Sequence, residues 1–172
     1  MPKSKGVPDL LWIFDSVTIS NFSLVGRLDI LQARYAHQLA LTTQVVDEIS
    51  RGVTSGRHDL EPILALVDNG IFRLLALTNE ERTTFGKLSN NLGQGEASTI
   101  AAALHRDATV VTDDRAARQA TRDLELSLTG TIGILIACVR DSTVPAATAD
   151  SVLESMVDAG FYSPVTRISD VL

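Results

Sequence analysis

The chain has 172 residues, of which 45% are hydrophobic, and a formal net charge of −6. This length fits a single domain with one core, and the composition excludes a disordered chain. The negative charge argues against a broad, non-specific nucleic-acid binder, which would present a basic surface, but it allows an enzyme that holds its substrate through metal ions.

Cysteine content and hydropathy indicate a cytoplasmic protein. The single cysteine, Cys138, excludes an internal disulfide framework and is expected in the core. No apolar run approaches the roughly 18–20 residues that a membrane span needs. The basic and then apolar start, MPKSKGVPDLLWIF, is too short in its apolar part for a signal peptide, because Asp15 ends it. We therefore expect a cytoplasmic protein with no membrane contact.

Segments typical of strands and helices alternate along the chain. The continuous apolar run at 10–14 predicts a strand that is buried on both faces. Further strands are expected at 38–43, 71–77, 108–112 and 126–130, and helices at 20–35, 44–52, 59–69, 79–90, 96–106, 113–124, 131–141 and 148–160, with Gly52 and Gly160 as helix ends. This alternation predicts an α/β fold, a three-layer sandwich with a central, mainly parallel sheet of four to five strands flanked by helices.

Acidic residues stand where the predicted strands end. Asp15 follows the strand at 10–14, and Asp113 and Asp114 follow the strand at 108–112. Ligands of open α/β sheets bind outside the carboxyl ends of the strands, so these carboxylates meet if the two strands are parallel neighbours. Glu96 follows the Gly-rich turn LGQG at the start of a helix, and Glu48 lies beside the buried face of the helix at 44–52, so both could join them.

Each of these acids also has a purely structural interpretation. Asp15 and one residue of the adjacent pair could cap helices, and Glu96 is favoured in a first helical turn. Asp114 and Arg118 are four residues apart and could form a helical ion pair, and Glu48 could be a surface charge. The adjacent pair is harder to explain in this way, because one Asp is enough for a cap.

Converging carboxylates need a compensating positive charge. Close like charges disfavour ionisation, and the usual compensation is a divalent cation. The three histidines, His37, His58 and His105, are scattered without metal-ligand spacing, which argues against zinc. Oxygen ligands favour Mg²⁺ or Mn²⁺, which activate water and neutralise phosphate during phosphodiester hydrolysis.

The order of these motifs resembles that of PIN-domain proteins. An apolar strand ends in Asp15, VVDEI carries Glu48, LGQGEASTIAAAL carries Glu96, and VVTDDRAAR carries Asp113 and Asp114. The sequence is similar to prokaryotic VapC-like PIN proteins of the subgroup with GEAEAI-type and DDRAAR-type motifs. The later segments LTGTIGILIACVRD and LESMVDAGFYSPVTRISDVL extend this likeness over nearly the whole chain.

The resemblance implies a PIN-like fold and a metal-dependent ribonuclease, often the toxin of a toxin–antitoxin pair and often a homodimer. It implies a catalytic quartet of Asp15, Glu48, Glu96 and Asp114 around Mg²⁺ or Mn²⁺, with Asp113 as a further ligand or a supporting group. RNA would be the substrate and an antitoxin protein a partner. We expect an N-terminal tail at 1–8, a PIN-like nuclease domain at 9–143, and a C-terminal helical extension at 144–172 packed on the same domain.

The sequence departs from the family pattern close to the first acid. PIN proteins usually carry a small hydroxyl or amide residue soon after this Asp, often two positions on, where this chain has Val17. Ser16 or Thr18 could take the role of positioning the acid or water, or the site could be weakened.

Two basic residues follow the acidic pair, and their role is open. Arg115 and Arg118 could contact phosphate or neutralise the acids in the absence of RNA. Surface ion pairs with Asp114 and Asp123 explain them equally well.

Two other functions compete with nuclease activity. A catalytically weak PIN fold that only binds RNA or protein stays open because of Val17. A phosphatase resembling the haloacid dehalogenases would need a second Asp at position 17 and a lysine in the middle of the chain. The only lysines are Lys3, Lys5 and Lys87, and Lys87 has no strand before it, which disfavours this class.

Overall fold

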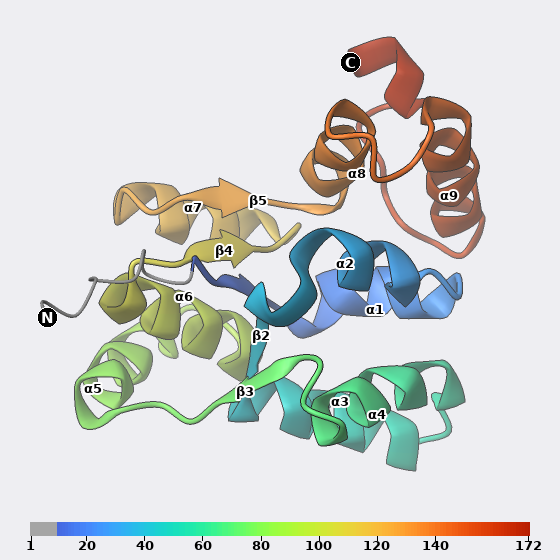
Figure 1. Ribbon diagram of the computed structural model, residues 1–172. Helices are drawn as coiled ribbons and strands as arrows, with labels where there is room; N and C mark the ends of the chain where they lie inside the picture. The colour runs from blue at the N-terminus through green and yellow to red at the C-terminus, as the bar shows by residue number, and fades with distance from the viewer. Residues whose placement is uncertain (1–9) are drawn as a thin grey trace, which may run out of the picture.

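A computed structural model describes residues 10–172, and Figure 1 shows how their helices and strands are arranged. Five short strands form one parallel sheet in the order β3-β2-β1-β4-β5. The strands are β1 (Trp12–Phe14), β2 (Leu39–Thr42), β3 (Arg73–Leu75), β4 (Thr109–Val111) and β5 (Leu128–Thr129). The predicted α/β class with a parallel sheet is confirmed, while the predicted tail at 1–8 lies outside the described residues.

Helices connect the strands and cover both faces of the sheet (Figure 1). They are α1 (Ser16–Leu24), α2 (Leu28–Tyr35), α3 (Thr43–Thr54), α4 (Glu61–Asp68), α5 (Asn79–Leu88), α6 (Gln94–Arg106), α7 (Arg115–Asp123), α8 (Thr131–Arg140) and α9 (Ala146–Asp158), with short 3₁₀ segments η1 (Ala36–Gln38), η2 (His58–Leu60) and η3 (Ile168–Val171).

The central strands are buried on both sides. Ile13 and Val110 face the apolar cluster under α5, α6 and α7. Phe14 and Val111, the next residue on each strand, face the larger cluster formed with α1–α4, α8 and α9. Successive side chains of a strand point to opposite faces, and both faces of this sheet are covered. Both consecutive residues of each strand, Ile13 and Phe14 on β1 and Val110 and Val111 on β4, must therefore be apolar. This requirement explains the continuous apolar runs of the sequence.

Two predictions about helix ends are wrong. The segment at 20–35 contains the end of α1 and all of α2, separated by a turn in which Gly26 has φ +68°. Gly52 does not close its helix, because α3 continues to Thr54. A Cβ atom at Gly52 would lie 2.7 Å from Cδ1 of Leu60, so the glycine allows η2 to pack closely against α3.

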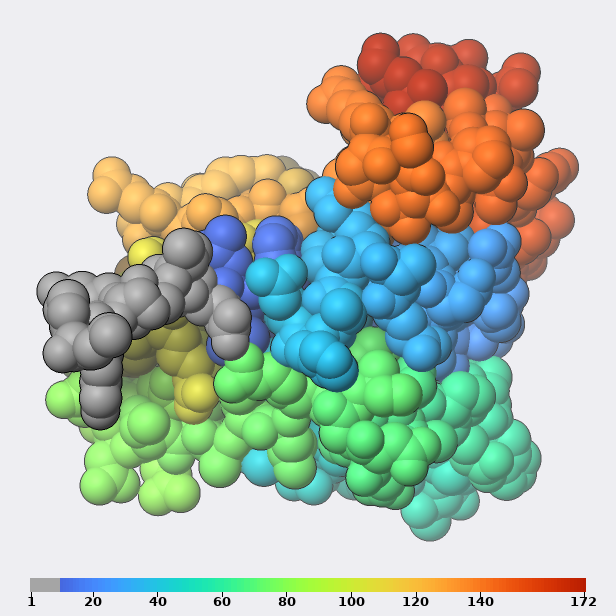
Figure 2. Space-filling model, viewed as in Figure 1, coloured from blue at the N-terminus to red at the C-terminus, as the bar shows by residue number. Residues whose placement is uncertain are grey.

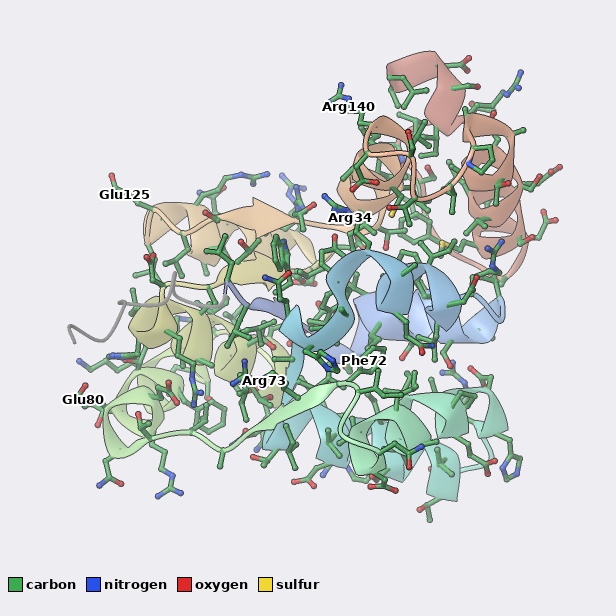
Figure 3. All side chains as sticks on the ribbon, in the orientation of Figure 1. Arg34, Phe72, Arg73, Glu80, Glu125 and Arg140 are labelled. Atoms are coloured by element: carbon green, nitrogen blue, oxygen red, sulfur yellow. The ribbon has the colours of Figure 1, made fainter. Side chains whose placement is uncertain are left out.

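The C-terminal helices pack on the rest of the sandwich. In Figure 2 the orange and red part of the chain rests on the blue part that contains α1 and α2. Leu153 of α9 and the predicted core residue Cys138 of α8 belong to the same buried cluster as Phe14. Figure 3 shows Arg34 between α2 and α8, where its Nη1 lies 3.0 Å from Oδ2 of Asp141. The predicted boundary between a domain at 9–143 and an extension at 144–172 stays a prediction.

A membrane-spanning segment is not found among the helices of residues 10–172, since none is both long and apolar enough. The cytoplasmic location stays a prediction.

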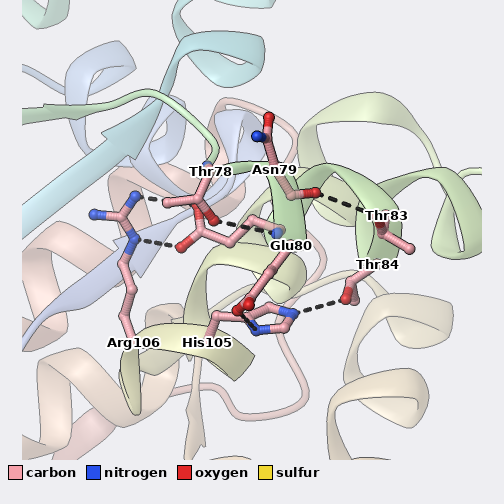
Figure 4. A network of polar contacts seen from close by, with 8 residues as sticks. Thr78, Asn79, Glu80, Thr83, Thr84, His105 and Arg106 are labelled. Atoms are coloured by element: carbon pink, nitrogen blue, oxygen red, sulfur yellow. Dashed lines mark hydrogen bonds and ion pairs between the residues drawn. The ribbon is translucent and has the colours of Figure 1, made fainter.

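A buried carboxylate, Glu81, joins α5 to α6 through Arg106, and Figure 4 shows Thr78 and Arg106 in this network. Glu81 is 1% exposed and forms a capping box with Thr78 at the start of α5. Arg106 donates to both oxygens of Glu81, at 2.7 and 3.1 Å, and to the carbonyl of Ala76. Burial alone would raise the pKa of Glu81, but the hydrogen bonds from Arg106 and from the Thr78 amide hold it below its usual value.

Removal of Arg106 tests the importance of this pair for stability. Arg106→Ala leaves Glu81 charged and buried, and we expect a loss of about 2–4 kcal/mol in the free energy of unfolding, measured in urea. Adding Glu81→Gln should recover part of the loss, because it removes the uncompensated charge. Arg122→Ala, at an exposed position of α7, is the control. Equal stability of the two single variants would contradict the account.

Candidate active site

The pairing of β1 with β4 brings together the acids that follow these strands. The two strands are parallel neighbours in a register that places Phe14 beside Val111. The next residues along the chain, Asp15 and Thr112, therefore leave the sheet at the same edge, and the amide of Asp15 donates to the carbonyl of Val111 at 3.0 Å. The expectation that these strands are parallel neighbours is confirmed.

Asp15 is both a helix cap and a buried acid. Its Oδ1 accepts a hydrogen bond from the amide of Thr18 at 2.8 Å, which caps α1, and its Oδ2 accepts a very short one from the hydroxyl of Thr112. The residue is 2% exposed. Burial raises the pKa of Asp15 to about 6, although both threonines lower it, and the nearby charge of Asp113 raises it further.

Thr112 links the first and the last acid of the predicted quartet. Its hydroxyl donates to Asp15 and accepts from the amide of Asp114 at 3.2 Å. The side chain is almost fully buried. Sequence reasoning did not select this residue, although its place at the strand end, one residue before the acidic pair, could have identified it.

The two adjacent aspartates have different environments. Asp114 is exposed and caps α7 through Oδ1, which accepts from the amide of Ala117 at 2.8 Å. Asp113 turns toward α1 and α8. It accepts from the hydroxyl of Thr18 at 3.2 Å and from the amide and hydroxyl of Thr131 at 2.9 and 2.5 Å. Asp113 thus joins α1 to α8, whereas Oδ2 of Asp114 makes no hydrogen bond to the described residues. Thr131 was also missed, since only the fold brings it to Asp113.

Glu48 is held from two sides at the start of α6. Ser16 donates to its Oε2 at 2.6 Å, and the amide of Gly95 donates to its Oε1 at 2.8 Å. A Cβ atom at Gly95 would lie 2.5 Å from Oε2 of Glu48, so no larger residue fits there without displacing the carboxylate. The Gly-rich turn LGQG therefore runs into the first turn of α6 and provides a closely packed support for Glu48.

Glu96 lies in the first turn of α6 and is half-buried. Its pKa is raised, mainly by burial and further by the charges of Asp114 and Glu48. This coupling shows that carboxylates from α3, α6 and the start of α7 are electrostatic neighbours.

The predicted positioning and phosphate-contact residues surround these acids. Ser16 contacts Glu48, and Thr18 contacts both Asp15 and Asp113. Val17 points into a hollow beside Glu48 and is 58% exposed.

The two arginines after the acidic pair differ. Arg118 donates through Nη1 to the carbonyl of Thr112 at 2.8 Å and so holds the end of β4. Arg115 is exposed at the first position of α7.

The carboxylates do not form a closed cage. Among residues 10–172, no three His, Cys, Asp or Glu side chains lie close enough together to make a ready-formed metal site. The arrangement is a set of neighbouring acids, coupled by charge and supported by hydroxyl and amide donors.

Comparison with solved structures finds similar chains, and PAE2754 among them shares the fold. PAE2754 from Pyrobaculum aerophilum has a TM-score of 0.52 at 16% identity, over 82% of this chain and 95% of that one. VapBC2 from Rickettsia felis, solved with a promoter DNA fragment, has a TM-score of 0.48 at 14% identity, over 70% of this chain and 98% of that one. FitAB, solved with a DNA fragment, has a TM-score of 0.49 at 19% identity, over 70% of this chain and 94% of that one.

Sequence comparison identifies the family. None of the curated proteins shows a significant match to this chain. A family model described as a PIN domain matches residues 11–172, which include all the acids described above and the C-terminal helices. The chain belongs to the PIN-domain family.

Proposed function

We propose that this protein is a metal-dependent endoribonuclease that hydrolyses RNA phosphodiester bonds with Mg²⁺ or Mn²⁺. One observation carries the proposal: Asp15, Glu48, Glu96 and Asp114 come from separate segments of the chain to the same edge of the sheet, where burial raises the pKa of Asp15 and Glu96 and the charges of Asp114 and Glu48 raise that of Glu96 further. Membership of the PIN-domain family supports the same conclusion.

The residues fit a hard divalent cation. All the candidate ligands are carboxylate oxygens, which Mg²⁺ and Mn²⁺ prefer. In the part of the chain that the structure describes, no Arg, Lys or His forms an ion pair with any of the four acids. Burial is the main cause of the raised pKa values of Asp15 and Glu96, and the charges of neighbouring carboxylates add to it. A bound cation would supply the missing positive charge.

The proposed ligands are Asp15, Glu48, Glu96 and Asp114. When bound, the cation would supply a Lewis acid that neutralises phosphate charge and lowers the pKa of water. The protein itself supplies the fixed positions of the ligands. Thr112 sets Asp15 and Asp114 relative to each other.

Further residues support this centre. Ser16 and Gly95 fix Glu48, and Asp113 supports the site by joining α1 to α8, so we assign it as a supporting group. Arg115, exposed next to Asp114, is proposed to contact the phosphate backbone. Arg118 serves the site by holding the end of β4.

Val17 does not favour the alternative of a fold that binds RNA or protein without cutting. The hydroxyl groups on either side of it, in Ser16 and Thr18, both contact acids of the site. The positioning function that Val17 lacks is therefore present at its neighbours.

We also propose that the chain acts as the toxin of a toxin–antitoxin pair and binds an antitoxin protein, as its resemblance to VapC-like proteins implies. The homodimer implied by the same resemblance stays a prediction.

Cleavage of RNA tests the proposed activity. The purified protein with Mg²⁺ or Mn²⁺ should cut single-stranded RNA, and EDTA should abolish the reaction. Asp15→Asn and Asp114→Asn should each lower kcat by about 100-fold or more, because they weaken cation binding. Asp123→Asn, at the exposed end of α7, is the matched control and should stay active. Cleavage that survives both site substitutions would refute the assignment.

A pair of glycine variants tests the support of Glu48. Gly95→Ala and Gly86→Ala both place a methyl group in a helix, but only the former meets Glu48, since nothing lies within 4 Å of a Cβ at Gly86. We expect Gly95→Ala to lower kcat by about tenfold or more through misplacement of the carboxylate. Gly86→Ala should keep full activity. Circular dichroism melting should show both variants folded, and unchanged kcat in Gly95→Ala would contradict the proposed role of Glu48.

The unfavourable burial of Asp15 predicts a pH-dependent stability in the absence of metal. The pKa of Asp15 is about 6 in the folded protein, above its usual value of 3.8, so the folded state binds a proton more tightly than the unfolded state. The destabilising contribution of Asp15 in EDTA should therefore shrink as the pH falls from 7 to 4, and the difference between wild type and an uncharged variant isolates it from the other carboxylates. Asp15→Asn keeps a capping oxygen and should stabilise the protein at pH 7 by about 1–3 kcal/mol, an advantage that disappears near pH 4.

Asp29→Asn is the control for this measurement. The hydrogen bonds from Arg27 lower the pKa of Asp29, so its substitution should not stabilise the protein. Thermal melts between pH 4 and 7 provide the data. Destabilisation by Asp15→Asn at pH 7 would contradict this account. It would mean that the charged carboxylate stabilises α1 as a helix cap by more than its burial costs.

A further inference from the structure

A groove passes along the proposed active site. A hollow beside Glu48 is lined by Val17 and Leu24, which also line a second hollow of about 500 Å³. Phe161 and Tyr162 line this second hollow and a third, of about 430 Å³, that reaches Asp113. Neighbouring hollows share these side chains, and we call the surface that they line the Tyr162 groove; Phe161 and Tyr162 also line a hollow of about 830 Å³ against α9.

Tyr162 is the most exposed large hydrophobic side chain in residues 10–172, with 90% of its surface accessible. Its hydroxyl makes no hydrogen bond within this part of the chain. The other tyrosine, Tyr35, is 2% exposed and packs against Trp12 and Phe14. Burial of the Tyr35 ring contributes to the core, whereas the ring of Tyr162 stays exposed and lines the second hollow together with two other exposed apolar side chains, Val17 and Leu24.

The backbone on both sides of Tyr162 is fixed. The preceding Phe161 packs against the main core cluster, and its amide donates to the carbonyl of Met156 at 2.9 Å, past Gly160 with φ +108°. On the other side, the hydroxyl of Ser163 donates to the carbonyl of Val165 at 2.6 Å. The backbone that carries the exposed ring is therefore anchored beside the groove and is not a free chain end.

The arginines that line the groove have partners within the protein. Arg57 forms two hydrogen bonds with Asp59, at 3.1 and 2.8 Å, and Arg118 donates to the carbonyl of Thr112. The whole chain also carries a net charge of −6. A polyanion in this groove would gain little from long-range attraction, so its affinity must come from short-range contacts.

We infer that Tyr162 stacks on an unpaired nucleobase of the RNA strand that enters the active site. This inference rests on the proposed function. An aromatic ring with free faces stacks on any base, and Val17 and Leu24 offer apolar contact beside it. Bases in a duplex are already stacked on their neighbours, so the contact favours single-stranded RNA. The first and third hollows are lined by Glu48 and Asp113 of the proposed site, and this position beside the acids favours RNA over a protein segment as the occupant.

Binding measurements with three variants test this role. Fluorescence anisotropy with a labelled single-stranded RNA, with Ca²⁺ in place of Mg²⁺ to limit cleavage, gives the Kd of each. Tyr162→Ala should weaken binding by about 5- to 100-fold, and Tyr162→Phe, which keeps the ring, should stay within about twofold of wild type. Leu74→Ala is the control, because Leu74 is 52% exposed on β3 but does not line the groove.

Two further readouts separate stacking from a general structural effect. In Mg²⁺, Tyr162→Ala should raise KM and leave kcat at saturating RNA nearly unchanged. A series of RNAs would each carry one abasic nucleotide at a different position. One of these RNAs should bind wild type and Tyr162→Ala with the same Kd, because the base that stacks on Tyr162 is already absent from it. A fully paired hairpin should show little difference between the two proteins.

The outcomes distinguish this inference from the proposed function. If the wild type cleaves RNA and Tyr162→Ala binds RNA with the wild-type Kd, the stacking role is refuted and the nuclease proposal stays intact. A wild-type protein that neither binds nor cuts RNA would refute both. If Tyr162→Ala instead weakened binding of an antitoxin and left RNA affinity unchanged, the groove would be a protein interface and the inference would be wrong.

Discussion

The parallel register of β1 on β4 is the constraint on which the proposed site depends. It places Phe14 beside Val111, and the chain then leaves both strands at one edge as Asp15 and Thr112. A slip of one residue would exchange the two faces of a strand and turn these apolar side chains toward the wrong clusters. The core therefore fixes the register, and the register fixes the distance between the acids. Stability of the sheet and geometry of the site have the same origin.

Structural and chemical roles coincide in the acids. Asp15 and Asp114 are both helix caps, and each cap occupies one carboxylate oxygen. The two interpretations of an Asp after a strand, as a cap or as a ligand, are thus compatible. The cap orients the carboxylate, because its bonded oxygen is fixed to the helix start. The cost of burying these carboxylates appears in the raised pKa of Asp15 and Glu96, to which neighbouring carboxylate charges add.

The sequence predicts the fold and most of the acids because their causes are local. Apolar runs mark the buried strands, and Asp15 and Asp114 stand at strand ends. The supporting contacts depend on residues far apart in the chain, such as the bond from Thr131 to Asp113 and the approach of Gly95 to Glu48, and no local pattern encodes them. The end of α3 was predicted wrongly for a similar reason. A glycine that makes room for a distant side chain, as Gly52 does for Leu60, looks the same in the sequence as a glycine that ends a helix.

The central claim is that the acids at this edge form a cation site, and anomalous diffraction tests it most directly. Crystals grown or soaked with Mn²⁺, measured at the manganese absorption edge, would locate every bound ion without reference to activity. The account predicts an anomalous peak within coordination distance, about 2.0–2.3 Å, of carboxylates of the proposed ligands Asp15, Glu48, Glu96 and Asp114. A fully ordered site with no peak there, or with Mn²⁺ bound only elsewhere on the protein, would contradict it.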